Sequence, residues 1–102
     1  MGIRLISRVR GALLGAAVGD ALGAPFEGAH TVSPAGLARL KQDPGPLRYT
    51  DDTATTIAVA ESLIQCNGFD GPMMAKRLAA GYFAEPWRGY GESAPQVFRM
   101  LS

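Results

Sequence analysis

The fold is decided by the stretch Tyr49-Thr-Asp-Asp-Thr-Ala-Thr-Thr-Ile-Ala-Val-Ala-Glu-Ser-Leu-Ile-Gln-Cys66. A proline- and glycine-rich loop precedes it, and Asn67-Gly68, a pair typical of a helix end, follows it. Between these breaks the apolar side chains recur at helical spacing, which predicts one helix over residues 51–66. We expect the apolar stripe of this helix to lie in the core. Its members are Ile57, Ala60 and Ile64 on one face, with Val59 and Leu63 beside them.

A run of small and apolar residues, about residues 8–22, predicts another helix near the N-terminus. Its glycines recur every four positions and therefore share one face. They are Gly11, Gly15, Gly19 and Gly23. Isolated glycines destabilise a helix by roughly 1 kcal/mol each, so four in register indicate a surface that a neighbour approaches closely. A packed helix is the favoured neighbour, and a ligand is the alternative.

Capping and breaking residues predict three further helices and no strand. Ser33-Pro34 has the serine and proline that open a helix, which is expected to end before the loop at residues 43–46. Asp70 is expected to cap the next helix, which Pro86 ends. Ser93-Ala-Pro-Gln96 has the form of a capping box for the last one. The sequence therefore predicts an all-α fold, and no repeat or linker divides it.

Composition narrows the class of protein. The chain has 102 residues, a formal net charge of +1, 47% hydrophobic and 19% charged residues. These values are typical of an ordinary soluble domain and argue against disorder and nucleic-acid binding. Its one cysteine excludes an internal disulfide and fits a reducing compartment. The apolar run between Arg10 and Asp20 is about half of the roughly 20 residues that a membrane span needs. We expect a cytoplasmic protein with no membrane partner.

The sharpest chemical feature is the motif Thr50-Asp51-Asp52-Thr53, which places two carboxylates and two hydroxyls where a loop meets a helix. Such oxygen ligands suit Mg²⁺ or Mn²⁺. Adjacent helical residues point about 100° apart, so the two aspartates can converge on one ion only at the irregular start of the helix. The alternative is simple capping and dipole complementation, worth roughly 0.3–1 kcal/mol. From spacing alone both interpretations stay open.

Other polar groups are less specific. Glu27 follows Pro25, which is expected to end the helical segment, and a lone carboxylate there is usually just solvated. Arg88-Gly-Tyr-Gly91 precedes a predicted helix, where backbone N–H groups can receive phosphate, although a plain turn is the commoner explanation. His30 is the sole histidine, so no histidine-based triad or zinc cluster can be assembled.

Taken together, these segments resemble the ADP-ribosylglycohydrolase family, the relatives of dinitrogenase reductase-activating glycohydrolase. The resemblance covers residues 10–27 and Tyr49-Thr-Asp-Asp-Thr-Ala54, continues through Glu61-Ser-Leu63, and extends more loosely to residues 88–91 and the last predicted helix. Within the family, the sequence is most similar to the branch that removes ADP-ribose from serine.

The resemblance implies a fold, an activity and a set of roles. The fold is an orthogonal all-α multi-helix bundle, with two Mg²⁺ ions, or Mn²⁺, in a complete site. Thr50, Asp51 and Asp52 are expected to be ligands of one ion, and Glu27 to be the acidic residue near the scissile ribosyl bond. Gly89, Tyr90 and Gly91 are expected to contact ADP-ribose. The implied reaction cleaves the glycosidic bond between ADP-ribose and a modified protein or small molecule.

One departure from the family pattern is clear. Family members are longer and carry a second ligand set in a C-terminal Asp-x-Asp-Thr segment, whereas no Asp-x-Asp occurs in these 102 residues. We therefore expect residues 1–102 to be the N-terminal part of a single ADP-ribosylglycohydrolase-like domain, inactive in isolation. The alternative is a truncated, catalytically inactive ADP-ribose-binding or structural, crystallin-like protein.

Overall fold

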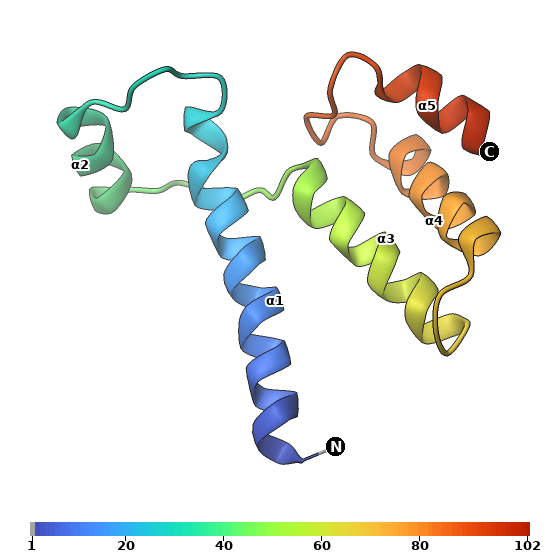
Figure 1. The fold of residues 1–102 in the computed structure, drawn as a ribbon. Coiled ribbons are helices and arrows are strands. Elements are labelled where there is room, and N and C mark those ends of the chain that lie inside the picture. Colours follow the sequence, from blue (N-terminus) through green and yellow to red (C-terminus); the bar gives the residue numbers. More distant parts are fainter. Residues whose placement is uncertain (1) are drawn as a thin grey trace. The chain divides into compact units, whose positions relative to one another are not determined.

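A computed structural model describes residues 2–102, in which helices are joined by loops and no strand occurs (Figure 1). The all-α prediction is therefore confirmed. The elements are α1 (Ile3–Gly23), the 3₁₀ helix η1 (Ala24–Phe26), α2 (Pro34–Gln42), α3 (Asp51–Gln65), α4 (Gly71–Ala84) and α5 (Ala94–Leu101).

The chain divides into two compact units, with the boundary between Tyr49 and Thr50. The first unit contains α1, η1 and α2, and the second contains α3, α4 and α5. That both units are parts of one ADP-ribosylglycohydrolase-like domain stays a prediction.

In the first unit, α1 begins at Ile3, earlier than the sequence pattern predicted. The backbone N–H groups of Leu5 and Ile6 both donate to the carbonyl of Gly2, at 3.0 and 3.1 Å, which starts the helix there. Within the first unit, the in-register glycines of α1 have no closely packed neighbour. Apart from the backbone of α1 itself, a Cβ built on Gly11, Gly15, Gly19 or Gly23 would meet no atom of this unit within 4 Å. The predicted close packing against another helix is not made inside this unit. None of the described helices is long and apolar enough to cross a membrane.

The start of α2 follows the predicted chemistry. Ser33 is the N-cap, and its Oγ accepts a hydrogen bond from the Gly36 N–H at 3.0 Å, with Pro34 at the first helical position. A Cβ added at Gly36 would lie 3.2 Å from the Ser33 Oγ and 3.6 Å from the Phe26 ring. Phe26, at the end of η1, therefore lies against the first turn of α2.

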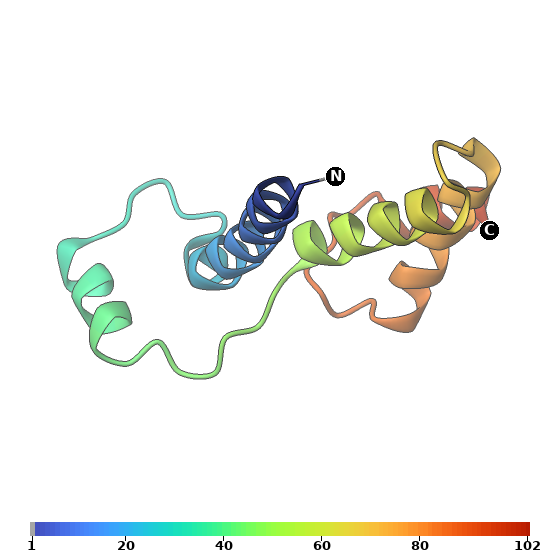
Figure 2. The ribbon, with the colours of Figure 1, turned by 90° about the horizontal axis from the view of Figure 1, so that it is seen from below.

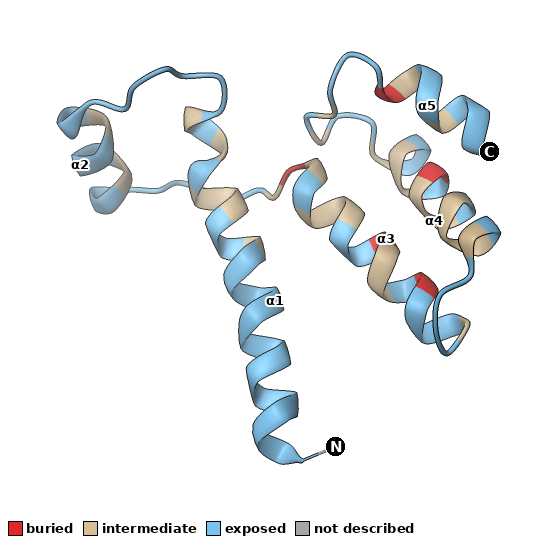
Figure 3. Ribbon diagram, in the orientation of Figure 1, coloured by how far each residue is buried: buried red, intermediate tan, exposed pale blue. Residues whose placement is uncertain are grey.

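In the second unit, α4 packs against both α3 and α5 (Figure 1, Figure 2). The buried positions of α3 and α4, red in Figure 3, are small residues: Ala58 and Ser62 on α3 and Ala79 on α4. Ala58 and Ser62 are four residues apart and share one face of the helix. Their size lets the helices approach closely, since a Cβ added at Gly81 of α4 would lie 4.0 Å from the Ala58 Cβ.

The predicted core stripe of α3 is therefore wrong for this unit. Ile57 is 42% exposed and Ile64 is 80% exposed, and Leu63 is exposed as well. The reason is that α4 meets the small-residue face of α3, which is displaced around the helix from the apolar stripe. The size and hydrophobicity of the side chains on α3 therefore do not by themselves determine which face of this helix is buried.

The ends of α3 and α4 match their local signals. Asn67 has a φ of 49° and Gly68 a φ of 142°, and the Gly68 N–H donates to the carbonyl of Leu63 at 3.0 Å, which closes α3. Asp70 caps α4, because its Oδ1 accepts the Met73 N–H at 2.9 Å. These two predictions are confirmed.

The predicted capping box at Ser93 is wrong. Ser93 is the N-cap of α5, but its backbone has φ −81° and ψ −11°, and its side chain makes no capping hydrogen bond. Helical dihedrals at this position turn the hydroxyl away from the N–H groups that an extended N-cap would reach. Only the Ser93 carbonyl takes part, accepting the Val97 N–H at 3.1 Å.

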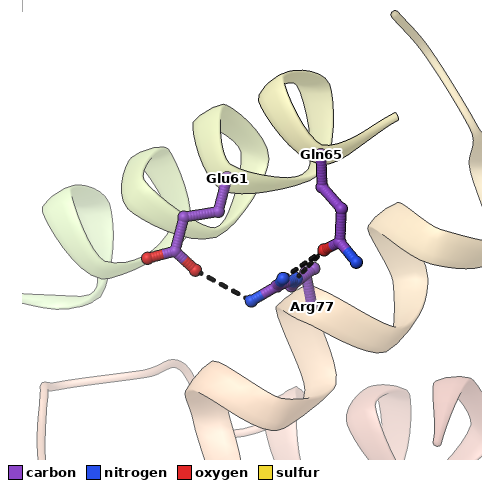
Figure 4. A network of polar contacts seen from close by, with 3 residues as sticks. All are labelled: Glu61, Gln65 and Arg77. Carbon is purple, nitrogen blue, oxygen red and sulfur yellow. Dashed lines mark hydrogen bonds and ion pairs between the residues drawn. The ribbon is translucent and has the colours of Figure 1, made fainter. Parts of the chain in front are cut away.

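A polar network joins α3 to α4 at the surface (Figure 4). Arg77 of α4 forms an ion pair with Glu61 of α3 at 3.2 Å, and its guanidinium also donates to the Gln65 side chain. The two charged side chains are 38% and 53% exposed. Exposed pairs of this kind contribute at most about 1 kcal/mol, so the network orients the two helices more than it stabilises them.

Candidate functional site

The first turn of α3 is built around Thr50. This residue has an extended backbone, with φ −101° and ψ −167°, and is 8% exposed. Its Oγ1 accepts a hydrogen bond from the Asp52 N–H at 3.3 Å, so Thr50 is the N-cap of the helix. From the sequence, the aspartates could either cap the helix or bind a metal ion. In the structure the cap is the Thr50 hydroxyl and not an aspartate.

Asp51 and Asp52 occupy the first two helical positions, the former half-buried and the latter exposed. Their backbone carbonyls accept hydrogen bonds from the hydroxyls of Thr55 and Thr56, each at 2.8 Å. Threonine hydroxyls of the next turn therefore bond back to the backbone carbonyls of both aspartates. Dipole complementation accounts for one acidic residue here but gives little reason for two in series.

The loop between α4 and α5 makes a hydrogen bond with the same turn of α3. The carbonyl of Arg88, between α4 and α5, accepts the Asp51 N–H at 2.7 Å. Arg88 in turn donates through its backbone to the Glu85 carbonyl at 3.3 Å and through Nη2 to Glu85 Oε2 at 2.8 Å. The structure thereby places the predicted cation-binding turn beside the predicted ligand loop, because Gly89 directly follows Arg88.

The Gly89-Tyr90-Gly91 loop combines an exposed backbone with a packed ring. Gly89 has a φ of 89°, a conformation that favours glycine. The Tyr90 ring lies 4.9 Å from the Tyr82 ring and 5.5 Å from the Phe98 ring, both edge-on. Gly89 and Gly91 are exposed. The aromatic ring therefore anchors the loop to α4 and α5, and the glycine backbone is the part available to a ligand.

In the first unit, Glu27 is exposed and follows η1, with its N–H donating to the Ala24 carbonyl at 3.2 Å. The short helix η1 continues α1, because Gly23 and Ala24 keep right-handed helical dihedrals. Asp20 and Glu27 therefore lie on one side of this helical segment, and their carboxylate oxygens are within 4.8 Å of each other. The sequence analysis did not predict that the two acids are neighbours. The available signal was their spacing of two helical turns along the chain.

Sequence reasoning also missed the role of Glu85 and Arg88. The hydrogen bond from the Asp51 N–H to the Arg88 carbonyl joins segments far apart in the chain, and no local pattern encodes it. The one usable signal was their spacing, since an acidic and a basic residue three positions apart, just after a helix ended by Pro86, can pair across the turn.

All 102 residues match the ADP-ribosylglycohydrolase family, and the chain belongs to it. Among its curated relatives, ADP-ribosylhydrolase ARH3 of Mus musculus is 44% identical over 110 residues, covering 96% of this chain and 30% of that protein. ADP-ribosylhydrolase ARH3 of Danio rerio is 42% identical, covering 98% and 29%. An uncharacterized protein of Archaeoglobus fulgidus is 32% identical, covering 92% and 33%. The chain thus spans about 30% of the length of the ARH3 relatives.

Proposed function

We propose that this chain supplies one half of a metal-dependent ADP-ribosylglycohydrolase site. The complete site would hydrolyse the glycosidic bond between ADP-ribose and a modified protein or a small molecule. The observation that carries the proposal is the first turn of α3. Thr50 caps the helix, Asp51 and Asp52 take the first two helical positions, and the Asp51 N–H donates to the carbonyl of Arg88, the residue before the Gly89–Gly91 loop.

The donor set of this turn fits a hard dication. Thr50, Asp51 and Asp52 offer one hydroxyl and two carboxylates, the oxygen ligands that Mg²⁺ and Mn²⁺ accept. We assign Mg²⁺ as the ion, with Mn²⁺ as the substitute. When bound, it would supply Lewis-acid stabilisation of substrate oxygens and orient the ribose hydroxyls.

Glu27 is the proposed proton-transfer group. Glycoside hydrolysis requires a proton for the leaving glycosidic oxygen and the removal of one from the attacking water. Its exposed carboxyl group, held at the end of η1, can donate the first proton and as a carboxylate accept the second. The exposed backbone of Gly89 and Gly91 is the proposed contact for the ADP-ribose moiety, because N–H groups before a helix suit phosphate oxygens.

The test is a chimera in which residues 1–102 replace the matching segment of the Mus musculus relative. Release of ADP-ribose from modified protein in the presence of Mg²⁺ is expected, and Asp51→Ala or Asp52→Ala in the chimera should reduce it to background. Circular dichroism confirms folding of each protein. A folded chimera that is inactive, or that is indifferent to both alanine variants, would refute the proposal.

A second candidate function is ADP-ribose binding without turnover, or a structural, crystallin-like role. It is favoured by one observation, that the exposed backbone of Gly89 and Gly91 can contact ADP-ribose without taking part in hydrolysis. Calorimetric titration of the chain with ADP-ribose separates the two, because the binding protein would retain affinity while the chimera stays inactive. For either function we propose a cytoplasmic location.

A further inference from the structure

We propose that Glu85 and Arg88 are positioning residues for the cation-binding turn, so that Mg²⁺ binding at Thr50–Asp52 and the order of the segment 85–91 are coupled. This inference rests on the proposed function, because it assumes that the first turn of α3 binds the ion. The inference goes beyond the proposed function in two ways. It gives Glu85 and Arg88 a role, and it couples Mg²⁺ binding to the order of the segment 85–91.

The link is the hydrogen bond from the Asp51 N–H to the Arg88 carbonyl, at 2.7 Å. The first N–H groups of a helix have no partner within the helix, and their partners fix how the chain enters it. Here one partner is the Thr50 hydroxyl and the other is a carbonyl of a separate segment. The direction of the Asp51 carboxylate therefore depends on where the Arg88 carbonyl lies.

That carbonyl is anchored on both sides. Before it, the Arg88 guanidinium pairs with Glu85 at 2.8 Å, and the two side chains are 16% and 35% exposed. After it, Gly89 reverses the chain with a positive φ, and the Tyr90 ring packs against Tyr82 and Phe98. A shift of the ion pair would displace the carbonyl because the three features are consecutive in the chain.

Charge adds to this geometry. The guanidinium of Arg88 is mostly buried and belongs to the residue whose carbonyl contacts the turn, so its positive charge would oppose a dication there unless it is balanced. Glu85 supplies the balancing charge in direct contact. Removing the Glu85 charge should therefore weaken cation binding both by loosening the carbonyl and by exposing the turn to the Arg88 charge.

The chain contains an intrinsic fluorescent probe of the segment 85–91. Trp87 is the sole tryptophan, lies next to Arg88 and is 70% exposed. If cation binding and the order of the segment are coupled, Mg²⁺ should restrict Trp87, and by linkage a more ordered segment should bind Mg²⁺ more tightly.

The experiment titrates the 102-residue chain with Mg²⁺, following heat by calorimetry and Trp87 by fluorescence anisotropy and acrylamide quenching. Partners that orient metal ligands typically change affinity by about 10–100-fold. We expect Glu85→Gln to weaken Mg²⁺ binding about tenfold and to remove the Trp87 response. Glu85→Asp, which keeps the charge, should restore affinity to within about threefold of wild type.

The matched control is Glu61→Gln, which makes the same change in the other ion pair of the unit, with Arg77. It should alter thermal stability slightly and leave Mg²⁺ affinity and the Trp87 response intact. If Glu85→Gln behaves like Glu61→Gln while Asp51→Ala abolishes binding, the positioning role is wrong and the cation site stands. If wild type binds no Mg²⁺, or Asp51→Ala binds it normally, the proposed site fails and the inference fails with it.

Discussion

If Thr50 caps α3 and the aspartates bind the cation, substitutions at Thr50 and Asp52 should differ in their effect on stability without metal and agree in their effect on the response to Mg²⁺. Thr50→Val removes the hydroxyl that accepts the Asp52 N–H, whereas Asp52→Asn keeps the shape of the side chain and removes its charge. Without metal, the threonine variant should therefore be the less stable of the two. With Mg²⁺, both variants should lose the stabilisation that wild type gains.

The magnitudes follow from the geometry. Loss of an N-cap destabilises by about 0.5–2 kcal/mol. The 3.3 Å distance between Thr50 Oγ1 and the Asp52 nitrogen is long, but Thr50 is only 8% exposed, so Thr50→Val leaves a part-buried N–H without its acceptor and should cost more than about 1 kcal/mol. Loss of one exposed charge at a helix N-terminus removes roughly 0.3–1 kcal/mol. Mg²⁺ at ten times its Kd should add about 1.4 kcal/mol to the free energy of unfolding of wild type. In a small domain each kcal/mol shifts Tm by roughly 4–8 °C.

The assay is thermal unfolding with and without Mg²⁺, with Thr50→Ser as the control because it keeps the hydroxyl. Thr50→Ser should match wild type in both conditions. The reasoning is refuted if Asp52→Asn loses as much stability as Thr50→Val without metal and still gains the full wild-type shift with it. That pattern would mean that the aspartate caps the helix and does not bind the ion.

Three further predictions concern other parts of the chain. In the chimera with the Mus musculus relative, Glu27→Gln should abolish hydrolysis and leave ADP-ribose affinity within about threefold, because proton transfer is lost and binding groups remain; normal turnover would contradict the role. Ser62→Ala should raise the unfolding free energy by about 1 kcal/mol, measured by urea denaturation, since the buried Ser62 Oγ has no hydrogen-bond partner among residues 2–102; unchanged or lower stability would contradict it. Residues 1–102 alone should release no ADP-ribose with Mg²⁺ or Mn²⁺, because one set of three protein ligands can bind an ion but cannot also clamp the ribose and the leaving oxygen; clear metal-dependent release would overturn the half-site proposal.

The sequence predicted the features that depend on a few consecutive residues. Ser33 and Asp70 cap their helices as expected, and Asn67-Gly68 ends α3, because a cap or a positive φ is chosen within one turn. Ser93 is an exception, because its side chain does not cap α5 although its residue type is a common N-cap. Its residue type fits a capping box, but a preceding turn gives it helical dihedrals that prevent the hydroxyl from capping.

Packing was predicted less well, because it is decided by the partner. The apolar stripe of α3 has the right period for a core face, yet α4 contacts the side that carries Ala58 and Ser62. Small residues on both helices permit the closer approach, and no rule that ranks faces by hydrophobicity selects that side. The candidate site shows the same contrast between local and long-range features. Its oxygen donors were predicted from the motif, whereas the contact of the Arg88 carbonyl with the first turn of α3 was not predicted.

That carbonyl also resolves an electrostatic objection to a cation at this position. A helix N-terminus carries about half a positive charge, which arises from N–H groups without partners. At the start of α3, the Asp51 N–H points at the Arg88 carbonyl and the Asp52 N–H at the Thr50 hydroxyl, so two of these groups are satisfied by oxygen. The carboxylates of Asp51 and Asp52, when ionised, add two negative charges, which exceed what remains of the positive end. The first turn of α3 is therefore an attractive place for a dication despite lying at a helix N-terminus, and its attraction depends on the segment that contributes the Arg88 carbonyl.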